Sequence, residues 1–327
     1  MSKIKTIGVL TSGGDSPGMN AAIRAVVRTA IENGLFVKGI YNGFKGLIDG
    51  NYIDLNSRSV SNIIQRGGTI LKSARCKEFH VKEGREKAFD SLRKANIDGL
   101  IVIGGDGTFA GAKVFFDEFG VPIIGLPGTI DNDIFGTDFT IGFDTALNTI
   151  TEAVDKIRDT AASHDRLFFI EVMGRDSGCL ALWSGVAGGA EEIILPESEF
   201  RIEQLINLLR KGAQLKKTSS IVIVGEGGGA SGKAYKIAKQ VCEIAVEFET
   251  KVTVLGHIQR GGKPSAFDRV LASRLGVISV YSIISGRSNC MVGWLNQKIE
   301  YTSFEKAIKR HSPLDESLLG LYKTLSS

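Results

Sequence analysis

The sequence has few cysteines and no pairing pattern among them. Only four occur in 327 residues, and they are widely separated: Cys76, Cys179, Cys242 and Cys290. Disulfide frameworks and zinc sites use closely and regularly spaced cysteines. We therefore expect four reduced thiols, as in a cytoplasmic protein, and neither a disulfide scaffold nor a cysteine metal site.

A strong charge of one sign is also absent. The chain carries 40 Lys and Arg against 36 Asp and Glu, which gives a formal net charge of +4, and the two signs are interspersed. So small an excess argues against nucleic acid as a partner, although it suits small anionic ligands.

No apolar run is long enough to cross a bilayer, and no signal-peptide pattern opens the chain, so we expect no membrane partner and a cytoplasmic location. Repeats, low-complexity tracts and proline-rich linkers are missing as well. With 43% hydrophobic and 23% charged residues, the composition is that of a globular protein. The length suggests two domains or two interleaved lobes.

The sequence does contain a succession of apolar runs that end in glycine or polar residues. They predict strands in Thr6–Ser12, Phe36–Gly43, Asp98–Thr108, Val121–Thr129, Leu167–Gly174, Ser219–Gly229 and Lys251–Gly262. Helical spacing separates them, as in Gly18–Gly34, Thr145–His164 and Lys233–Thr250. Strands that alternate with helices indicate an α/β fold with mostly parallel, doubly wound sheets. The first crossing between lobes is expected near Gly142, and the last sixty or so residues are weakly patterned.

Two of these strands end in glycine loops: TSGGDSPGMN follows Thr6–Ser12, and GGDGT ends Asp98–Thr108. In open parallel sheets, ligands bind beyond the carboxyl ends of the strands. TSGGDSPGMN lacks the Lys-Ser/Thr ending of a P-loop, so it is either a phosphate-binding backbone or only a tight strand-to-helix turn. GGDGT is more specific: Gly105 and Gly107 clear the backbone of side chains, and Asp106 offers a carboxylate to Mg²⁺ beside substrate phosphates.

LPGTIDND places two acids, Asp131 and Asp133, directly after a Pro-Gly turn. Asp and Asn are common turn residues, which is one interpretation. The other is catalytic: beside a bound nucleotide, Asp131 can accept a proton from an attacking hydroxyl. Phosphoryl transfer also needs cations, and loop arginines are candidates, although each alone is more often a surface charge: Arg75, Arg166, Arg175 and Arg260. His257, in a glycine-flanked strand end, suits phosphate or sugar contact and not metal binding, because it has no suitably spaced partner.

Together these motifs closely resemble the bacterial-type ATP-dependent 6-phosphofructokinase family. The resemblance extends from about Thr6 to Arg274 through LTSGGDSPGMNAAIR, LKSARC, IGGDGT, GLPGTIDND, IGFDTA, EVMGRDSG and VLGHIQRGG. It implies two interleaved doubly wound lobes with the active site in the cleft between them. The nucleotide-binding lobe would comprise residues 1–141 plus 258–308, and the sugar-phosphate lobe 142–257 plus 309–327.

The resemblance also implies an activity, transfer of the γ-phosphate of ATP to O1 of fructose 6-phosphate, and a role for each matching residue. Asp131 would be the base, with Asp133, Thr129 and Arg175 as further catalytic residues, and Asp106 would hold Mg²⁺. The nucleotide would be bound by Gly14, Arg75, Cys76, Gly105, Asp106, Gly107 and Thr108. The sugar phosphate would be bound by Thr129, Ile130, Asp131, Arg166, Met173, Gly174, Arg175, Glu226, Lys251, His257, Ile258, Gln259 and Arg260. Arg166 would reach from a neighbouring subunit, which implies a homotetramer with shared sites.

Two glycines indicate whether the phosphoryl donor is ATP or pyrophosphate. Pyrophosphate-dependent relatives carry Asp where Gly107 stands and Lys where Gly128 stands, and an aspartate would crowd and repel an α-phosphate. Glycine at both positions favours ATP.

Several positions depart from the family pattern. Lys251 stands where the family has arginine and loses its bidentate grip on phosphate. Cys76 replaces an aromatic residue, and Asp176 replaces a tyrosine. An effector site is matched by Arg24, Arg28, Arg158, Gly189, Glu191 and Lys217 but not by Ser57, Asn62 and Leu215, so regulation by ADP or phosphoenolpyruvate stays open. Arg24 and Arg28 can equally be one solvated helix face.

Three other functions are compatible with an α/β fold of this kind. A pyrophosphate-dependent enzyme conflicts with Gly107 and Gly128. A non-catalytic nucleotide-binding regulatory subunit is expected to lack the base or the metal carboxylate, and both Asp131 and Asp106 are present. A dinucleotide-dependent oxidoreductase would need an acidic residue after the second strand, where this chain has Tyr41-Asn42-Gly43.

Overall fold

The computed structural model describes residues 4–162, 166–215, 220–228, 231–310 and 312–325. They form two compact units. The first comprises Met1–Ile130, Ile134–Thr145 and Arg260–Ser312, and the second Asp131–Asp133, Ala146–Gln259 and Pro313–Ser327. Residues 131–133 therefore group with the second unit, whereas the family resemblance puts them in the first lobe. The reason is local: the Ser177 hydroxyl donates to the carbonyl of Asp131 (3.0 Å).

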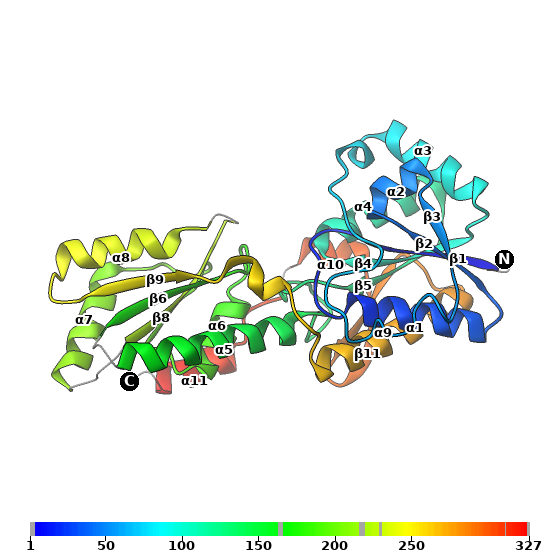
Figure 1. Cartoon of the computed structure of the whole chain (residues 1–327). Helices are drawn as coiled ribbons and strands as arrows, with labels where there is room; N and C mark the ends of the chain where they lie inside the picture. Colours follow the sequence, from blue (N-terminus) through cyan, green and yellow to red (C-terminus); the bar gives the residue numbers. More distant parts are fainter. Residues whose placement is uncertain (1–3, 163–165, 216–219, 229–230, 311, 326–327) are drawn as a thin grey trace. The chain divides into compact units, whose positions relative to one another are not determined.

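The first unit is built on a seven-stranded sheet (Figure 1). Its strand order is β11-β10-β5-β4-β1-β2-β3, and only β3 and β11 are antiparallel to their neighbours. The strands are β1 (Thr6–Thr11), β2 (Phe36–Ile40), β3 (Tyr52–Leu55), β4 (Gly99–Gly104), β5 (Ile123–Pro127), β10 (Cys290–Leu295) and β11 (Lys298–Ser303). Every residue of β1, β4 and β5 is buried, as expected of parallel strands covered on both faces.

Helices cover both faces of this sheet. Alternate residues of β4 face opposite ways: Ile101 and Ile103 pack in the core with α1 (Met19–Glu32) and α9 (Ala266–Ile284), and Leu100 and Val102 pack in the other core. That second core is formed with α2 (Gly43–Asp49), α3 (Lys82–Lys94), α4 (Asp106–Phe119), α10 (Phe304–Lys309) and the 3₁₀ turn η1 (Lys77–His80). Figure 1 shows α2 and α3 on one side of the sheet and α1 and α9 on the other.

The second unit has a four-stranded parallel sheet, in the order β7-β8-β6-β9. Its strands are β6 (Leu167–Val172), β7 (Glu192–Ile194), β8 (Ser220–Gly225) and β9 (Thr250–Val254). Its helices are α5 (Phe143–Ala162, whose first residues belong to the first unit), α6 (Cys179–Ala187), α7 (Ile202–Gln214), α8 (Lys233–Ile244), α11 (Glu316–Leu325) and the 3₁₀ turn η2 (Gly256–Arg260). Leu205 and Leu209 of α7 and Ile237 and Val241 of α8 share one core with β6 and β8.

The expected helix over Lys233–Thr250 was wrong at its C-terminal end, because α8 stops at Ile244. The backbone N–H of Leu167 donates to the carbonyl of Glu249 (3.1 Å), so the chain is already extended there and enters β9. None of the helices that the structure describes is long and apolar enough to cross a membrane.

The segments by which the chain leaves and re-enters the first unit are bonded to each other within that unit. Asp268, fully buried in α9, accepts from the backbone N–H groups of Gly142 and Thr145 (both 2.8 Å) and from the Thr145 hydroxyl (2.5 Å). The Thr145 hydroxyl in turn accepts from the N–H of Ser265 (2.9 Å). Asp268 therefore fixes the outgoing segment against the returning one.

Candidate functional site

In the first unit, the loops that follow β1, β4 and β5 meet at the carboxyl edge of the sheet. The N–H of Ser12 donates to the carbonyl of Ile103, and the N–H of Gly128 donates to that of Gly104 (both 3.0 Å). β2 and β4 lie on opposite sides of β1, so the strand order reverses between β1 and β4. A reversal of this kind is where open α/β sheets bind ligands.

The GGDGT loop opens directly into α4, with Gly105 before the helix and Asp106 as its first residue. The N-terminus of a helix presents free N–H groups and favours anions. Gly107 is exposed, and a Cβ added there would meet no atom within 4 Å. The hydroxyl of Thr108 is buried and has no hydrogen-bond partner among the described residues. An open backbone beside an unsatisfied hydroxyl fits a phosphate chain.

The donor set suits Mg²⁺ more than a structural metal. Within the part of the chain that the structure describes, no group of three or more His, Cys, Asp or Glu side chains could hold a metal ion. Mg²⁺ is usually bound through one or two carboxylates together with substrate phosphates and water. Asp106, at the start of α4, is the residue that fits this pattern.

The remaining nucleotide candidates lie in two other loops. Gly14 packs against the guanidinium of Arg260, which also donates to the carbonyl of Asp15 (3.3 Å). The structure thus places Arg260, expected to bind the sugar phosphate, against the β1 loop. Arg75 is exposed in the segment before η1, and Cys76 packs at the edge of the second core.

The acidic segment crosses between the units. Thr129 and Ile130 belong to the first; the carbonyl of Thr129 accepts from the Thr140 hydroxyl (2.6 Å), and the Ile130 side chain is fully buried, so only its backbone can contact a ligand. Asp131 and Asp133 belong to the second, and Asp131 is only 4% exposed.

Sequence reasoning missed two residues beside these acids, Ser177 and Cys179. Ser177 holds the Asp131 carbonyl, and the thiol of Cys179 donates weakly to the carbonyl of Asn132 (3.7 Å). Burial, together with the nearby carboxylates of Glu197, Asp133 and Asp131, raises the pKa of Cys179 to about 11, against the opposing effect of its hydrogen bond with Ser177. Cys179 is therefore a neutral packing residue at this site and not a nucleophile. No sequence signal identifies it, because the contact depends on two loops 47 positions apart.

In the second unit, the carboxyl ends of β6, β8 and β9 bring the sugar-phosphate candidates together. The N–H of Met173 donates to Oε1 of the buried Gln259 (3.1 Å), and the N–H of Arg175 donates to Oε1 of Glu226 (2.9 Å). Arg175 adopts a left-handed conformation (φ 52°) and, like His257 and Ile258, is exposed. Gly174 could not carry a side chain, because a Cβ there would collide with the carbonyl of Ser177.

Asp176 also takes part in this loop pair. Its Oδ1 accepts from the N–H of Gly228 (3.0 Å), parallel to the bond between Arg175 and Glu226. The residue that departs from the family pattern thus joins the β6 loop to the β8 loop.

Arg166 and Lys251 lie at the opposite, amino end of the same sheet, immediately before β6 and near the start of β9. Both pair with one carboxylate oxygen of Glu249, at 3.1 Å for Arg166 Nε and 2.8 Å for Lys251 Nζ. Sequence reasoning did not foresee this partner.

Of the effector candidates, the structure brings Arg158, Gly189 and Glu191 together in the second unit. The Arg158 guanidinium donates to the carbonyls of Gly188 (2.5 Å) and Gly189 (2.7 Å) and lies 4.0 Å from the Glu191 carboxylate. Arg24 and Arg28 lie on α1 in the first unit. Lys217 lies outside the described residues.

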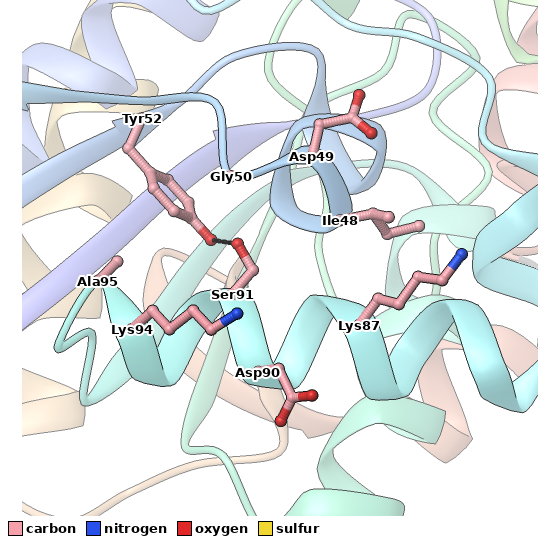
Figure 2. Close-up of a pocket in the computed structure, with 9 residues that line it drawn as sticks. All are labelled: Ile48, Asp49, Gly50, Tyr52, Lys87, Asp90, Ser91, Lys94 and Ala95. Atoms are coloured by element: carbon pink, nitrogen blue, oxygen red, sulfur yellow. Dashed lines mark hydrogen bonds between the residues drawn. The ribbon is translucent and has the colours of Figure 1, made fainter.

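A separate groove of about 550 Å³ lies between the end of α2, Tyr52 and α3 (Figure 2). It is lined by charged side chains and by the Tyr52–Ser91 hydroxyl pair (2.6 Å). No predicted site residue lines it, so it does not belong to the candidate site.

Comparison with known proteins identifies the family. The family model for phosphofructokinase matches residues 6–283. The chain belongs to the phosphofructokinase family. It is 55% identical over 326 residues to ATP-dependent 6-phosphofructokinase 2 of Bacteroides thetaiotaomicron, and the match covers all of both chains. It is 52% identical to ATP-dependent 6-phosphofructokinase 1 of Thermus thermophilus, covering 99% of this chain and 100% of that one.

Solved structures of phosphofructokinases have the same fold as this chain. Phosphofructokinase from Saccharomyces cerevisiae superposes with a TM-score of 0.87 at 36% identity, covering 98% of this phosphofructokinase and 47% of the yeast chain, so this chain spans about half the length of the yeast protein. A pyrophosphate-dependent phosphofructokinase from Marinobacter aquaeolei superposes with a TM-score of 0.80 at 23% identity, over 96% of this chain and 86% of that one. At that identity the second likeness shows the fold alone.

Proposed function

We propose that this phosphofructokinase is the ATP-dependent 6-phosphofructokinase of glycolysis. It transfers the γ-phosphate of ATP to O1 of fructose 6-phosphate and yields fructose 1,6-bisphosphate and ADP. The observation that carries the proposal is the 52–55% identity, over essentially the whole chain, to relatives named for this activity. The reaction uses cytoplasmic metabolites, and the free state of all four cysteines suits that compartment.

ATP as the donor is supported by the GGDGT loop. The space at Gly107 leaves room for an α-phosphate, and an aspartate in its place would bring a negative charge toward it. Gly128 is packed against Ile103 and Met19, at 3.0 and 3.1 Å from an added Cβ, so a lysine there would require these side chains to move. Both positions support the ATP-dependent activity over the pyrophosphate-dependent one.

The chemistry assigned to this chain is positioning and proton acceptance. Asp131 accepts the proton of the O1 hydroxyl as that oxygen attacks the γ-phosphorus in line, and the leaving group is ADP. Ser177 fixes the carbonyl of Asp131, and the Cys179 thiol contacts the carbonyl of Asn132 beside it. Asp133, Thr129 and Arg175 are the further catalytic residues that the family resemblance implies. Asp106 holds Mg²⁺, which when bound neutralises phosphate charge. The glycines of GGDGT and the β1 loop present backbone N–H groups to the phosphates.

The sugar phosphate is held by the β6, β8 and β9 loops of one subunit together with Arg166 and Lys251 of another. Arg166 and Met173 flank the six residues of β6 and lie seven residues apart along the extended chain, about 23 Å. One sugar phosphate cannot contact Met173 and Glu226 at one end and Arg166 at the other. Arg166 and Lys251 can therefore reach a substrate only on a second copy, which supports an oligomer with shared sites; the homotetramer is the assembly that the family resemblance implies.

Allosteric control is a separate proposal, which concerns an effector site apart from the catalytic residues. The Arg158–Gly189–Glu191 cluster supports an effector site in the second unit, and Arg24 and Arg28 are further candidates. Control by an effector requires different contacts in two states.

A coupled assay tests the proposed function. With fructose 6-phosphate as acceptor, we expect product formation with ATP and Mg²⁺ and little with pyrophosphate. Turnover with pyrophosphate in place of ATP would support the alternative enzyme, and no turnover with either donor would support a regulatory role.

A further inference from the structure

Glu249 lies between the two cations assigned to the 6-phosphate. Glu249 and Lys251 are two residues apart in an extended chain, so their side chains lie on the same face. In the parallel pairing of β6 with β9, Leu167 lies opposite Thr250. Arg166, one residue earlier, therefore lies beside Glu249. One oxygen of Glu249 then contacts both Arg166 Nε (3.1 Å) and Lys251 Nζ (2.8 Å).

The contacts of Glu249 determine its charge state. The adjacent cations Lys251 and then Arg166 hold the pKa of Glu249 below its ordinary value, so the group is anionic at neutral pH. An anion that pairs with an arginine and a lysine makes the ionic contacts that a phosphate oxygen would make.

We propose that Glu249 is an internal competitor for phosphate, whose carboxylate occupies the Arg166–Lys251 pair until the 6-phosphate of the sugar displaces it. The inference deepens the proposed function and rests on it. It makes Glu249 a residue that determines specificity: an uncharged sugar brings nothing to replace the carboxylate, whereas a phosphomonoester does.

Exposure and charge favour displacement. The side chains are 55% exposed for Glu249, 46% for Lys251 and 30% for Arg166, and exposed ion pairs are individually weak. A phosphomonoester carries close to two negative charges at neutral pH and three acceptor oxygens, against one charge and two oxygens for the carboxylate. The phosphate therefore displaces the carboxylate from Arg166 and Lys251. The net affinity of the protein for the phosphate is reduced, because the ion pairs of Glu249 must be broken.

Glu249→Gln is the test, and the chain offers a matched control. Glu247 is exposed, lies two positions earlier and pairs with Arg210 (2.8 Å), so Glu247→Gln removes the same charge from the same segment without touching the Arg166–Lys251 pair. Fructose 6-phosphate and inorganic phosphate are titrated into each full-length protein by calorimetry in the absence of ATP, and steady-state kinetics are measured in parallel.

Glu249→Gln is expected to tighten fructose 6-phosphate binding and lower its KM by roughly three- to ten-fold, the range for one or two exposed ion pairs, with kcat unchanged. Glu247→Gln is expected to shift binding by less than about two-fold, and high salt should shrink the difference between the two variants. In a Lys251→Ala background, the gain from Glu249→Gln should be reduced, because one of the released cations is missing.

Other results overturn the proposal. Weaker binding in Glu249→Gln would show that Glu249 orients the cations for phosphate, and an effect equal to that of Glu247→Gln would show only a general charge effect. If no variant phosphorylates fructose 6-phosphate, the proposed function fails. The titration with inorganic phosphate still decides the role of Glu249 in that case.

Discussion

Asp131 combines near-complete burial with a tightly held backbone. Its side chain is 4% exposed, and the Ser177 hydroxyl fixes its carbonyl from the β6 loop. A base must lie within hydrogen-bonding reach of the proton that it accepts, so a fixed backbone is part of its function.

Asp131→Ser is expected to lower kcat by at least about 10²-fold, the low end for loss of a general base, and to leave ATP binding nearly intact. Asp131→Asn keeps the shape and should be as slow, which separates lost chemistry from lost packing. Steady-state kinetics and ATP titration measure both, and wild-type turnover in either variant would contradict the assignment.

Gly107→Asp is expected to weaken ATP binding by crowding and like-charge repulsion. Because a Cβ at this position meets nothing within 4 Å, the variant should fold normally. Gly107→Ala is the matched control, since it adds the Cβ without the charge and should bind ATP nearly as the wild type does. Equal ATP affinity in the aspartate and alanine variants would show that the loop does not contact the phosphates.

Lys251→Arg is expected to lower the KM for fructose 6-phosphate and to leave kcat near its starting value. Arginine grips phosphate through two donors, and a gain of about 1 kcal/mol, one hydrogen bond, is reasonable. Competition from Glu249 reduces that gain, because arginine also binds a carboxylate well. Lys251→Ala should raise the KM; if neither variant shifts it, Lys251 is only a surface charge.

At the scale of elements, the sequence predicted strands best where they are buried on both faces. β1, β4, β5, β6 and β8 are largely apolar, buried runs and were all expected, as were the more exposed β2 and β9. β7 has only three residues, and β3 and β11 are half-exposed edge strands without such a run. The β10–β11 hairpin has only a weak sequence signal, because its two-residue turn, in which Asn296 and Gln297 both have positive φ, lacks the usual glycine.

The features of the candidate site divide in the same way, into motifs that the sequence reveals and contacts that only the structure shows. Loops such as GGDGT and GTIDND could be recognised because each carries its chemistry in adjacent residues. The bonds of Ser177 to Asp131, Asp176 to Gly228 and Glu249 to Arg166 could not, because each joins segments far apart in the chain. Pairing of side chains across loops depends on the folded geometry, which residue spacing does not encode.

Asp268, the carboxylate that joins the two crossing segments, gives α9 a pH-dependent role in stability. Burial raises its pKa from 3.8 to about 6, against the opposing effect of its hydrogen bonds. The native state therefore holds this proton more tightly than the unfolded state, and the contribution of Asp268 to stability falls as pH rises from about 4 to 6.

Asp268→Asn removes that titration. The difference in melting temperature, wild type minus variant, is expected to fall between pH 4 and 6.5 and then to level off. Thermal unfolding of both proteins at several pH values measures it, and a difference that does not change with pH would contradict the shifted pKa.

At the scale of the whole molecule, most candidates for the two substrates belong to different units, although Thr129, Ile130 and Arg260 of the sugar-phosphate set lie in the first unit. GGDGT and the β1 loop lie in the first, and the β6, β8 and β9 loops in the second. Arg166 and Lys251 form a third group, at the end of the second sheet away from the other sugar-phosphate candidates. Of these three groups, only the third needs a second subunit in order to contact the substrate.

Mixing two inactive variants tests whether a second copy supplies Arg166. Asp131→Ser lacks the base but has Arg166, and Arg166→Ala lacks the arginine but has the base. If a site takes its base from one subunit and Arg166 from a neighbour, an Arg166→Ala subunit beside an Asp131→Ser subunit forms a complete site. Random assembly of equal amounts should then restore about one quarter of wild-type activity, because each of the two conditions is met half the time. The variants are unfolded and refolded together and assayed at a fructose 6-phosphate concentration well below the KM of Arg166→Ala. If each subunit used its own Arg166, no mixed oligomer would contain a complete site, and the activity would stay at the average of the two variants.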